Sequence, residues 1–253
     1  METTTGIWDN AEPPEPPKKV VFCVPTLKKP YQQTLDSIRD SMPEIEAAGW
    51  ESGMVSEIGC PYVSVARATM LRKALDAKAT HIFFIDHDVS WPVGAVLKLL
   101  ETKGDVVGCT YRFKQDEEKY MGTIFGEGSL YPTVRADGCI KMFNLPAGFL
   151  RITRAVVNKL MIAYPDLVYG ERCHQSLDLF NHGAYKGVWW GEDYAFCRRW
   201  CEINEEIWCI PDLDIAHHAV DKDYPGNFHT HMRHQPGGDL STQPVQPDDP
   251  RRK

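Results

Sequence analysis

The hydrophobic residues in the first half of the chain alternate between short continuous runs and longer stretches with helical spacing. The short runs predict buried strands at 20–24, 50–58, 82–85 and 105–110. The stretches between them predict helices at 34–48, 64–77 and 92–102. We expect Ser64 to cap the second helix and Pro92 to lie in the first turn of the third. This succession predicts an α/β fold with a doubly wound, mostly parallel sheet and helices on both faces.

The second half of the chain has a less regular pattern, with short apolar runs separated by glycine-containing turns. It predicts short strands at 119–124, 131–135, 139–144 and 207–210, and helices at 153–161 and 192–203. We interpret this half as an elaboration of one domain that spans residues 18–234. Segments 1–17 and 235–253 are rich in proline and have little to bury, so we expect a flexible start and a disordered tail.

The composition narrows the class of protein without identifying it. The chain has 253 residues, is 43% hydrophobic and carries a formal net charge of -7, which disfavours a broad electrostatic surface for nucleic acid. It contains no apolar run of roughly 18 residues and no signal-peptide core, so we predict neither a membrane span nor secretion. The eight cysteines are scattered, several within apolar runs, which favours free thiols in a reducing cytoplasm.

Two carboxylates one residue apart, Asp86 and Asp88, directly follow the apolar run 82–85. A buried strand that ends this way places both at the carboxyl edge of the sheet, where ligands bind in open α/β folds. Neighbouring carboxylates are costly unless something positive lies between them, and a divalent cation is the usual solution. Alternation lets both face one side while His87 faces away. The structural alternative is that Asp88 caps the helix near Pro92 while Asp86 lies in a turn.

Further motifs occur in a fixed order along the chain. They are Val24-Pro25-Thr26, Val65-Ala66-Arg67, Asp86-His87-Asp88, Pro146-Ala147-Gly148-Phe149-Leu150, Gly191-Glu192-Asp193 and His217-His218. In this order they resemble the motifs of nucleotide-sugar-dependent glycosyltransferases of the GT-A fold, including the virus-encoded relatives of the large inverting family. The resemblance covers about residues 18–220. It implies a GT-A-like domain whose elaboration lies on the acceptor side.

The resemblance implies a metal site that binds the donor diphosphate. Asp88 would bind Mn²⁺ or Mg²⁺ directly, and Asp86 would bind the ribose, or the metal through water. A late histidine would complete the metal shell, and both His217 and His218 are candidates. An imidazole ligand shifts the expectation from Mg²⁺ toward Mn²⁺.

The resemblance also implies contacts to a nucleotide-sugar donor, most simply a UDP-sugar. Pro25 and Thr26 would pack against the base and the ribose. Arg67 would reach the diphosphate or the base, or else it is an ordinary arginine on a helix surface. The polar segment 219–234 is expected to form a mobile lid over the phosphates or a solvated loop.

On the acceptor side, the resemblance implies an inverting transfer with a carboxylate base. Asp193 would remove the proton of the acceptor hydroxyl, and Glu192 would contact the acceptor. Trp189 and Trp190 suit an apolar wall under a sugar ring, although core packing explains them equally well. Gly148 would also lie against the acceptor.

Two other functions are alternatives. A nucleotidyltransferase shares the α/β architecture and the carboxylate-bound metal, but it usually has a glycine-rich loop after the first strand, which segment 25–29 lacks. A non-catalytic nucleotide-sugar-binding protein would keep the fold, although the intact acidic motifs argue against a decayed site. For a transferase, the acceptor could be a polysaccharide or other glycan. It could also be a hydroxymethylated DNA base modified by a virus-encoded enzyme in the host cytoplasm, although the acidic balance disfavours DNA.

Overall fold

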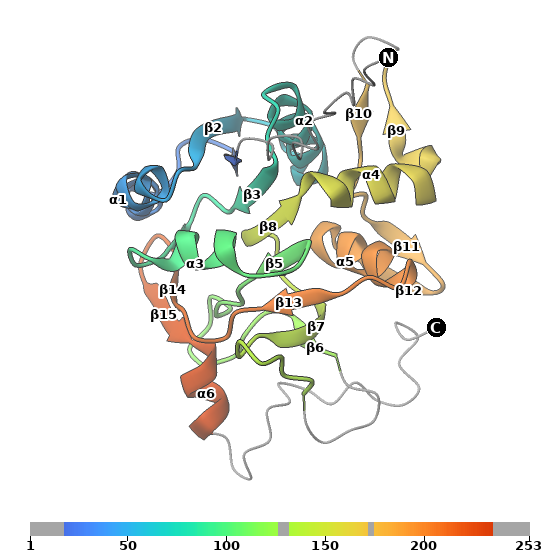
Figure 1. Cartoon of the computed structure of the whole chain (residues 1–253). Coiled ribbons are helices and arrows are strands. Elements are labelled where there is room, and N and C mark those ends of the chain that lie inside the picture. Colours follow the sequence, from blue (N-terminus) through green and yellow to red (C-terminus); the bar gives the residue numbers. More distant parts are fainter. Residues whose placement is uncertain (1–17, 126–131, 172–174, 235–253) are drawn as a thin grey trace, which may run out of the picture.

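The computed structural model describes residues 18–125, 132–171 and 175–234. Its centre is an eight-stranded sheet (Figure 1), with the strands in the order β2 (Glu51–Ile58), β1 (Lys19–Thr26), β3 (His81–Ile85), β8 (Phe149–Thr153), β5 (Val106–Gly108), β13 (Ile207–Cys209), β7 (Ile140–Asn144) and β6 (Thr123–Ile124). Strand β1 pairs in parallel with β2 and β3, and β13 pairs in parallel with β5. Strand β8 lies antiparallel between β3 and β5, and β7 lies antiparallel to β13. The predicted mostly parallel α/β sheet is confirmed.

Helices cover both faces of this sheet because alternate side chains of each strand enter different hydrophobic clusters. On β1, Val21 and Cys23 face one cluster, whereas Val20, Phe22 and Val24 face the other. The helices that pack on the first cluster are α2 (Val63–Asp76), α4 (Arg154–Ala163) and α5 (Glu192–Glu202). Those on the second are α1 (Gln32–Ala47) and α3 (Ala95–Glu101). The carboxyl ends of β1, β3 and β5 therefore meet at one edge between two helical layers.

Two helix starts differ from the predicted ones. Helix α2 follows Tyr62 and has no side-chain cap, so Ser64 lies inside its first turn rather than before it. Helix α3 begins at Ala95 instead of near Pro92, because the intervening Gly94 adopts a left-handed conformation with φ 91°. These shifts leave the order of the elements unchanged.

Segment 219–234, expected to be a mobile lid or a solvated loop, instead forms β15 (Asp223–Asn227) and α6 (Phe228–His234). Strand β15 belongs to a small sheet together with β14 (Asp214–His218) and the much earlier β4 (Val89–Ser90). Strand β14 pairs with β15 on one side and with β4 on the other. Since β4 follows the Asp86–Asp88 segment directly, this pairing brings a distant part of the sequence to the carboxyl edge of the main sheet.

The other predicted strands of the second half are short. Strand β6 covers only the end of segment 119–124, β7 matches segment 139–144, and Val134 makes an isolated bridge to Ile140. Three further pieces are β9 (Val168–Tyr169) paired with β10 (Ser176–Leu177), β11 (Gly183–Tyr185) paired with β12 (Val188–Trp190), and the short 3₁₀ helix η1 (Pro165–Leu167). No helix in the described ranges is long and apolar enough to cross a membrane. Both terminal segments, 1–17 and 235–253, lie outside the described residues.

Candidate active site

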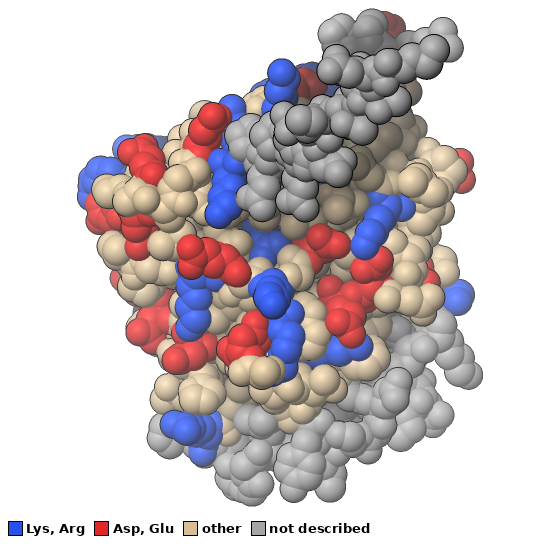
Figure 2. Space-filling model, in the orientation of Figure 1, with Lys and Arg blue, Asp and Glu red and all other residues tan. Residues whose placement is uncertain are grey.

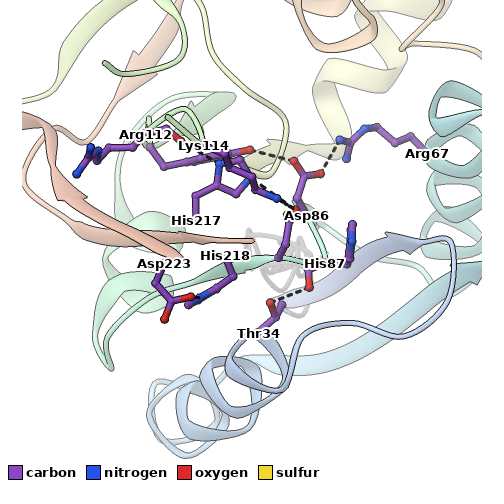
Figure 3. A network of polar contacts seen from close by, with 11 residues as sticks. Thr34, Arg67, Asp86, His87, Arg112, Lys114, His217, His218 and Asp223 are labelled. Atoms are coloured by element: carbon purple, nitrogen blue, oxygen red, sulfur yellow. Dashed lines mark hydrogen bonds and ion pairs between the residues drawn. The ribbon is translucent and has the colours of Figure 1, made fainter. Parts of the chain in front are cut away.

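Residues 86–88 form a turn beyond the end of β3, and other elements hold its backbone. Three hydrogen bonds fix it: Asp86 N–H to the Gly148 carbonyl (3.0 Å), Tyr31 N–H to the His87 carbonyl (2.8 Å) and His218 N–H to the Asp88 carbonyl (2.7 Å). The hydroxyl of Thr34 also donates to the His87 carbonyl (2.9 Å; Figure 3). Because the turn lies outside the strand, strand alternation does not govern His87, which lines the same pocket as both carboxylates. The backbone thus presents this acidic motif in one fixed arrangement.

The carboxylate of Asp86 is held by two buried side chains. Arg67 donates from Nη2 to Oδ1 (2.8 Å), and the Tyr111 hydroxyl donates to Oδ2 (2.9 Å). Burial, followed by the charge of Asp86, raises the pKa of Tyr111 well above its usual range, so the phenol remains a donor. A side chain at Gly148 would collide with this pair. Gly148, predicted as an acceptor contact, therefore makes room for Asp86.

Arg67 is not an ordinary surface arginine, because its side chain is only 2% exposed. Its Nη2 atom also lies 3.7 Å from Oε1 of Glu192, and its guanidinium lies over the rings of Phe84 and Phe180. Burial by itself lowers the pKa of Arg67, but the carboxylates of Asp86 and Glu192 outweigh it and the net shift is upward. Arg67 is a fixed positive charge among the carboxylates.

Asp88 has a different set of partners. Lys114 donates from Nζ to Oδ2 of Asp88, and Nε2 of His217 lies 3.6 Å from the same oxygen. Burial alone would raise the pKa of Asp88, but the neighbouring His217 and the ammonium group of Lys114 outweigh it and hold the pKa well below its usual range. In Figure 3, Lys114 and His217 lie on one side of the turn and Arg67 lies on the other. The two carboxylates of the motif are therefore neutralised separately.

The two late histidines have different surroundings. Nδ1 of His217 lies 2.9 Å from the Arg112 carbonyl, so this nitrogen donates a hydrogen bond, and Nε2 is the ring nitrogen on the side of Asp88. For His218, Nδ1 contacts Asp223 Oδ1 (2.6 Å) and Nε2 contacts Ser90 Oγ (2.7 Å), so both ring nitrogens are in use. Neighbouring residues of β14 point to opposite faces, and His217 lines the pocket whereas His218 does not.

A pocket of about 280 Å³ lies in front of the acidic motif. Its lining comes from the end of β1, the start of α2, the acidic turn and the start of α5: Pro25, Thr26, Leu27, Cys60, Pro61, Val63, Ala66, Arg67, Asp86, His87, Asp88, Glu192 and His217. Oγ1 of Thr26 and the Nε and Nη1 atoms of Arg67 are buried without a hydrogen-bond partner among the described residues. The pocket lining combines apolar side chains with charged ones, as ligand sites commonly do.

The acidic pair at the start of α5 comes close to this network from the second half of the chain. Glu192 lines the pocket, and Asp193 follows it, its Oδ1 accepting the Tyr194 N–H (2.8 Å). Burial, followed by the charge of Glu192, raises the pKa of Asp193 to about 7, although Arg67 opposes the shift. A carboxyl group with such a pKa can accept a proton near neutral pH, as a general base must.

The two tryptophans that were predicted to contact the acceptor differ in burial. Trp190 is 3% exposed and packs against Phe143 and Arg198, which makes it a core residue. Trp189, next to it on β12, is 70% exposed and lies near His182, with ring centroids 6.0 Å apart. Neither is part of the pocket lining. Of the two, only Trp189 offers its ring to a ligand.

The residues present suit a metal ion that is shared with a substrate. Within residues 18–125, 132–171 and 175–234, no three His, Cys, Asp or Glu side chains are grouped to hold a metal by themselves. Asp88 and His217 would supply one oxygen and one nitrogen ligand, and the remaining ligands would come from water and phosphate oxygens. Mg²⁺ is often bound in this way, through one or two carboxylates and substrate phosphates. The donor set therefore fits Mn²⁺ or Mg²⁺.

Tyr111 and Lys114 were not among the residues predicted from the sequence. Both follow β5, whose carboxyl end lies at the same edge as the ends of β1 and β3. The sequence offered one signal for them: a polar segment that directly follows a buried strand lies at this edge in a parallel topology. The contacts of Tyr111 with Asp86 and of Lys114 with Asp88 could not be predicted from that pattern.

Comparisons with known proteins leave the family unassigned. No protein-family model and no curated protein matches the chain. Among solved structures, A197 from STIV is 17% identical over 83% of this chain and 94% of its own, with a TM-score of 0.49. A glycosyltransferase involved in the glycosylation of the major capsid of PBCV-1 is 12% identical over 59% of this chain and 66% of its own, with a TM-score of 0.32. TarS 1–349 from S. aureus is 14% identical over 82% of this chain and 59% of its own, with a TM-score of 0.40.

Proposed function

We propose that this chain is a metal-dependent glycosyltransferase that moves a sugar from a nucleotide-sugar donor to a hydroxyl acceptor with inversion. One observation carries the proposal: a single sheet edge brings together two separately neutralised carboxylates and a third carboxyl group whose pKa is about 7. The first two, Asp86 and Asp88, suit a charged donor. The third, Asp193, suits the removal of a proton from the acceptor.

The donor, most simply a UDP-sugar, would bind in the pocket in front of the acidic turn. Pro25 offers apolar surface to a base, and Thr26 and Arg67 line the same pocket. Asp86, already oriented by Arg67 and Tyr111, would accept hydrogen bonds from the ribose hydroxyls. The pocket is small for a whole nucleotide-sugar, so the sugar would extend from it toward the start of α5.

Asp88 and His217 would hold the metal ion. His217 is the better of the two late histidines because its Nε2 atom faces Asp88, whereas both ring nitrogens of His218 have partners. When bound, Mn²⁺ or Mg²⁺ acts as a Lewis acid that neutralises the charge of a diphosphate leaving group. The imidazole nitrogen favours Mn²⁺.

Asp193 would act as the general base. It takes the proton of the acceptor hydroxyl while the acceptor oxygen bonds to the anomeric carbon and the bond from that carbon to the donor phosphate oxygen breaks. Attack from the face opposite the leaving group inverts the anomeric centre. Glu192, which lines the pocket, and Trp189, which is exposed, would contact the donor and acceptor sugars.

The surface charge bears on the class of acceptor. On the face drawn in Figure 2, acidic and basic side chains intermingle without a broad basic area, in keeping with the net charge of -7. A polyanion draws most of its affinity from basic contacts to its phosphates. A glycan acceptor is therefore favoured over a hydroxymethylated base in DNA.

Thermal unfolding with a panel of nucleoside diphosphates, each with and without Mn²⁺, tests the donor site. We expect one nucleoside diphosphate to raise the melting temperature only when Mn²⁺ is present, because ligand binding stabilises the folded state. The variant Asp88→Ala should lose this effect, while Asp76→Ala, which removes an exposed carboxylate on α2, should retain it. A metal-independent shift that survives in Asp88→Ala would contradict the metal assignment. Release of pyrophosphate rather than nucleoside diphosphate during turnover would indicate a nucleotidyltransferase instead.

A further inference from the structure

The side chain of Lys114 occupies the place where a cation would meet Asp88. Its Nζ atom donates to Oδ2 of Asp88, the oxygen that also lies 3.6 Å from Nε2 of His217. Both the carboxylate and the imidazole are largely buried, with 11% and 9% of their side chains exposed. A buried carboxylate needs a positive partner, and in this structure the ammonium group is that partner.

We propose that Lys114 is a built-in counter-ion that competes with the divalent cation for Asp88. The inference rests on the metal site of the proposed function. A cation held by Asp88 and His217 needs the same carboxylate oxygen, so Lys114 must leave it before the ion binds. The metal affinity of the site would then depend on Lys114, a residue that is not itself a metal ligand.

Lys114 is delivered by a well-defined segment rather than by a loose loop. Segment 111–121 folds back on itself through a bridge between Arg112 and Tyr120 and hydrogen bonds from Phe113 N–H to the Lys119 carbonyl (2.9 Å) and from Met121 N–H to the Tyr111 carbonyl (3.0 Å). The same segment places Tyr111 on Asp86, so one stretch of chain contacts both carboxylates of the acidic motif.

This segment is also joined to the small sheet that carries His217. The Arg112 carbonyl accepts from His217, the Arg112 guanidinium lies over the ring of Tyr224, and Asp116 pairs with Lys222. The backbone that carries Lys114 and the imidazole of His217 are therefore held together. The long, flexible side chain of Lys114 can move away from Asp88 while its backbone and His217 keep their positions.

Titration of the protein with Mn²⁺ alone, followed by the electron paramagnetic resonance signal of free Mn²⁺, tests the proposal without any sugar donor. Lys114→Gln removes the competitor and should bind Mn²⁺ roughly tenfold or more tightly than the wild type, since hydrogen bonds to charged groups contribute about this much. Lys114→Arg keeps the positive charge and should stay as weak as the wild type. Asp88→Ala should lose binding with either residue at position 114.

Lys119→Gln is the matched control, because Lys119 lies on the same segment but pairs with the exposed Glu117. Its Mn²⁺ affinity should equal that of the wild type. In thermal unfolding, Lys114→Gln should be less stable without metal and gain more from Mn²⁺, a combination that loss of packing alone would not produce.

Unchanged or weaker Mn²⁺ binding by Lys114→Gln, in a protein whose wild type binds Mn²⁺ through Asp88, would overturn the role of Lys114 alone. Absence of Mn²⁺ binding in both proteins would overturn this role and the metal site of the proposed function together. Tighter binding by Lys114→Gln would support the role of Lys114 even if no sugar transfer were found.

Discussion

The two halves of the molecule contribute to the site in different ways. The first half, residues 18–110, contributes groups fixed to strand ends and to a buried helix face: Thr26, Arg67, Asp86 and Asp88. The second half, residues 111–234, contributes side chains that reach the same edge from a connecting segment, a helix start and a small added sheet: Tyr111, Lys114, Glu192, Asp193 and His217. The first set therefore lies on elements of the central sheet and its packed helix, which we call the framework. The second set lies on elements that pack next to this framework.

This difference separates the groups that hold the site together from those that adjust its chemistry. Arg67 on α2 is buried where it pairs with the partly exposed Asp86 beyond the end of β3, and a buried charge without a partner is costly. In the proposed function, Lys114 would adjust the metal affinity and Asp193 would exchange a proton, at a site whose backbone is already fixed. Substitution of Arg67 should therefore act mainly on stability, and substitutions of Lys114 and Asp193 mainly on function.

The largest effect on stability is expected for Arg67→Met. The methionine keeps the contact with the neighbouring rings but leaves Asp86, Glu192 and Asp193 without their shared cation. Removing one partner of a buried ion pair costs about 3–5 kcal/mol, so the free energy of unfolding should fall by about 3 kcal/mol in denaturant titration. Arg72→Met, on the exposed side of α2, is the control and should cost less than about 1 kcal/mol. Equal losses in the two variants would contradict the framework role of Arg67.

Asp193→Asn is expected to raise the free energy of unfolding at neutral and higher pH, by less than Arg67→Met lowers it. The folded-state pKa of about 7 lies above the ordinary value of 3.8, so the folded protein retains a proton that the unfolded chain releases. The wild type should therefore lose stability as the pH rises from about 4 to about 7, and this loss should be complete above pH 7. The asparagine variant avoids it. It should match the wild type near pH 4 and exceed it at pH 8 by on the order of 2 kcal/mol.

The same variant tests the chemistry. Asp193→Asn should keep the metal-dependent stabilisation by the nucleoside diphosphate but reduce transfer by about 10²–10⁴-fold, the usual range for loss of a general base. Transfer by the wild type should rise with pH through about 7, because the base must be ionised. Full turnover by Asp193→Asn would rule this residue out as the base and leave the second half of the site without a catalytic carboxylate.

The smallest effect on stability is expected for Trp189→Ala. Its side chain is 70% exposed, so its loss should change the free energy of unfolding by less than about 0.5 kcal/mol. If it contacts the acceptor, the KM for the acceptor should rise while the KM for the donor stays the same. Trp190→Ala is the contrasting variant: its buried ring should cost about 3 kcal/mol or more. A stability loss of that size for Trp189→Ala would place it in the framework instead.

The regular part of the fold could be predicted because its physical cause is local. Segment 82–85 is a continuous apolar run, and it forms the buried strand β3 because a strand covered on both faces needs no polar positions. The helical spacing of segment 64–77 predicts α2 for the same kind of reason. Segment 219–234 was expected to be a loop because it is polar, but it forms β15 and α6 by pairing with β14 and burying Phe228 and Met232.

The sequence by itself determined the α/β class, the central strand and the place of Asp86 and Asp88 at its end, because period and strand length are properties of neighbouring residues. It did not determine which groups meet those carboxylates. The pairing of β4 with β14 places His217 rather than His218 beside Asp88, and the path of segment 111–121 brings Lys114 to Asp88. These contacts join residues more than 20 positions apart, and no local pattern records them. Only the packed tertiary structure decided how each carboxylate is neutralised, because that depends on which side chains are buried together.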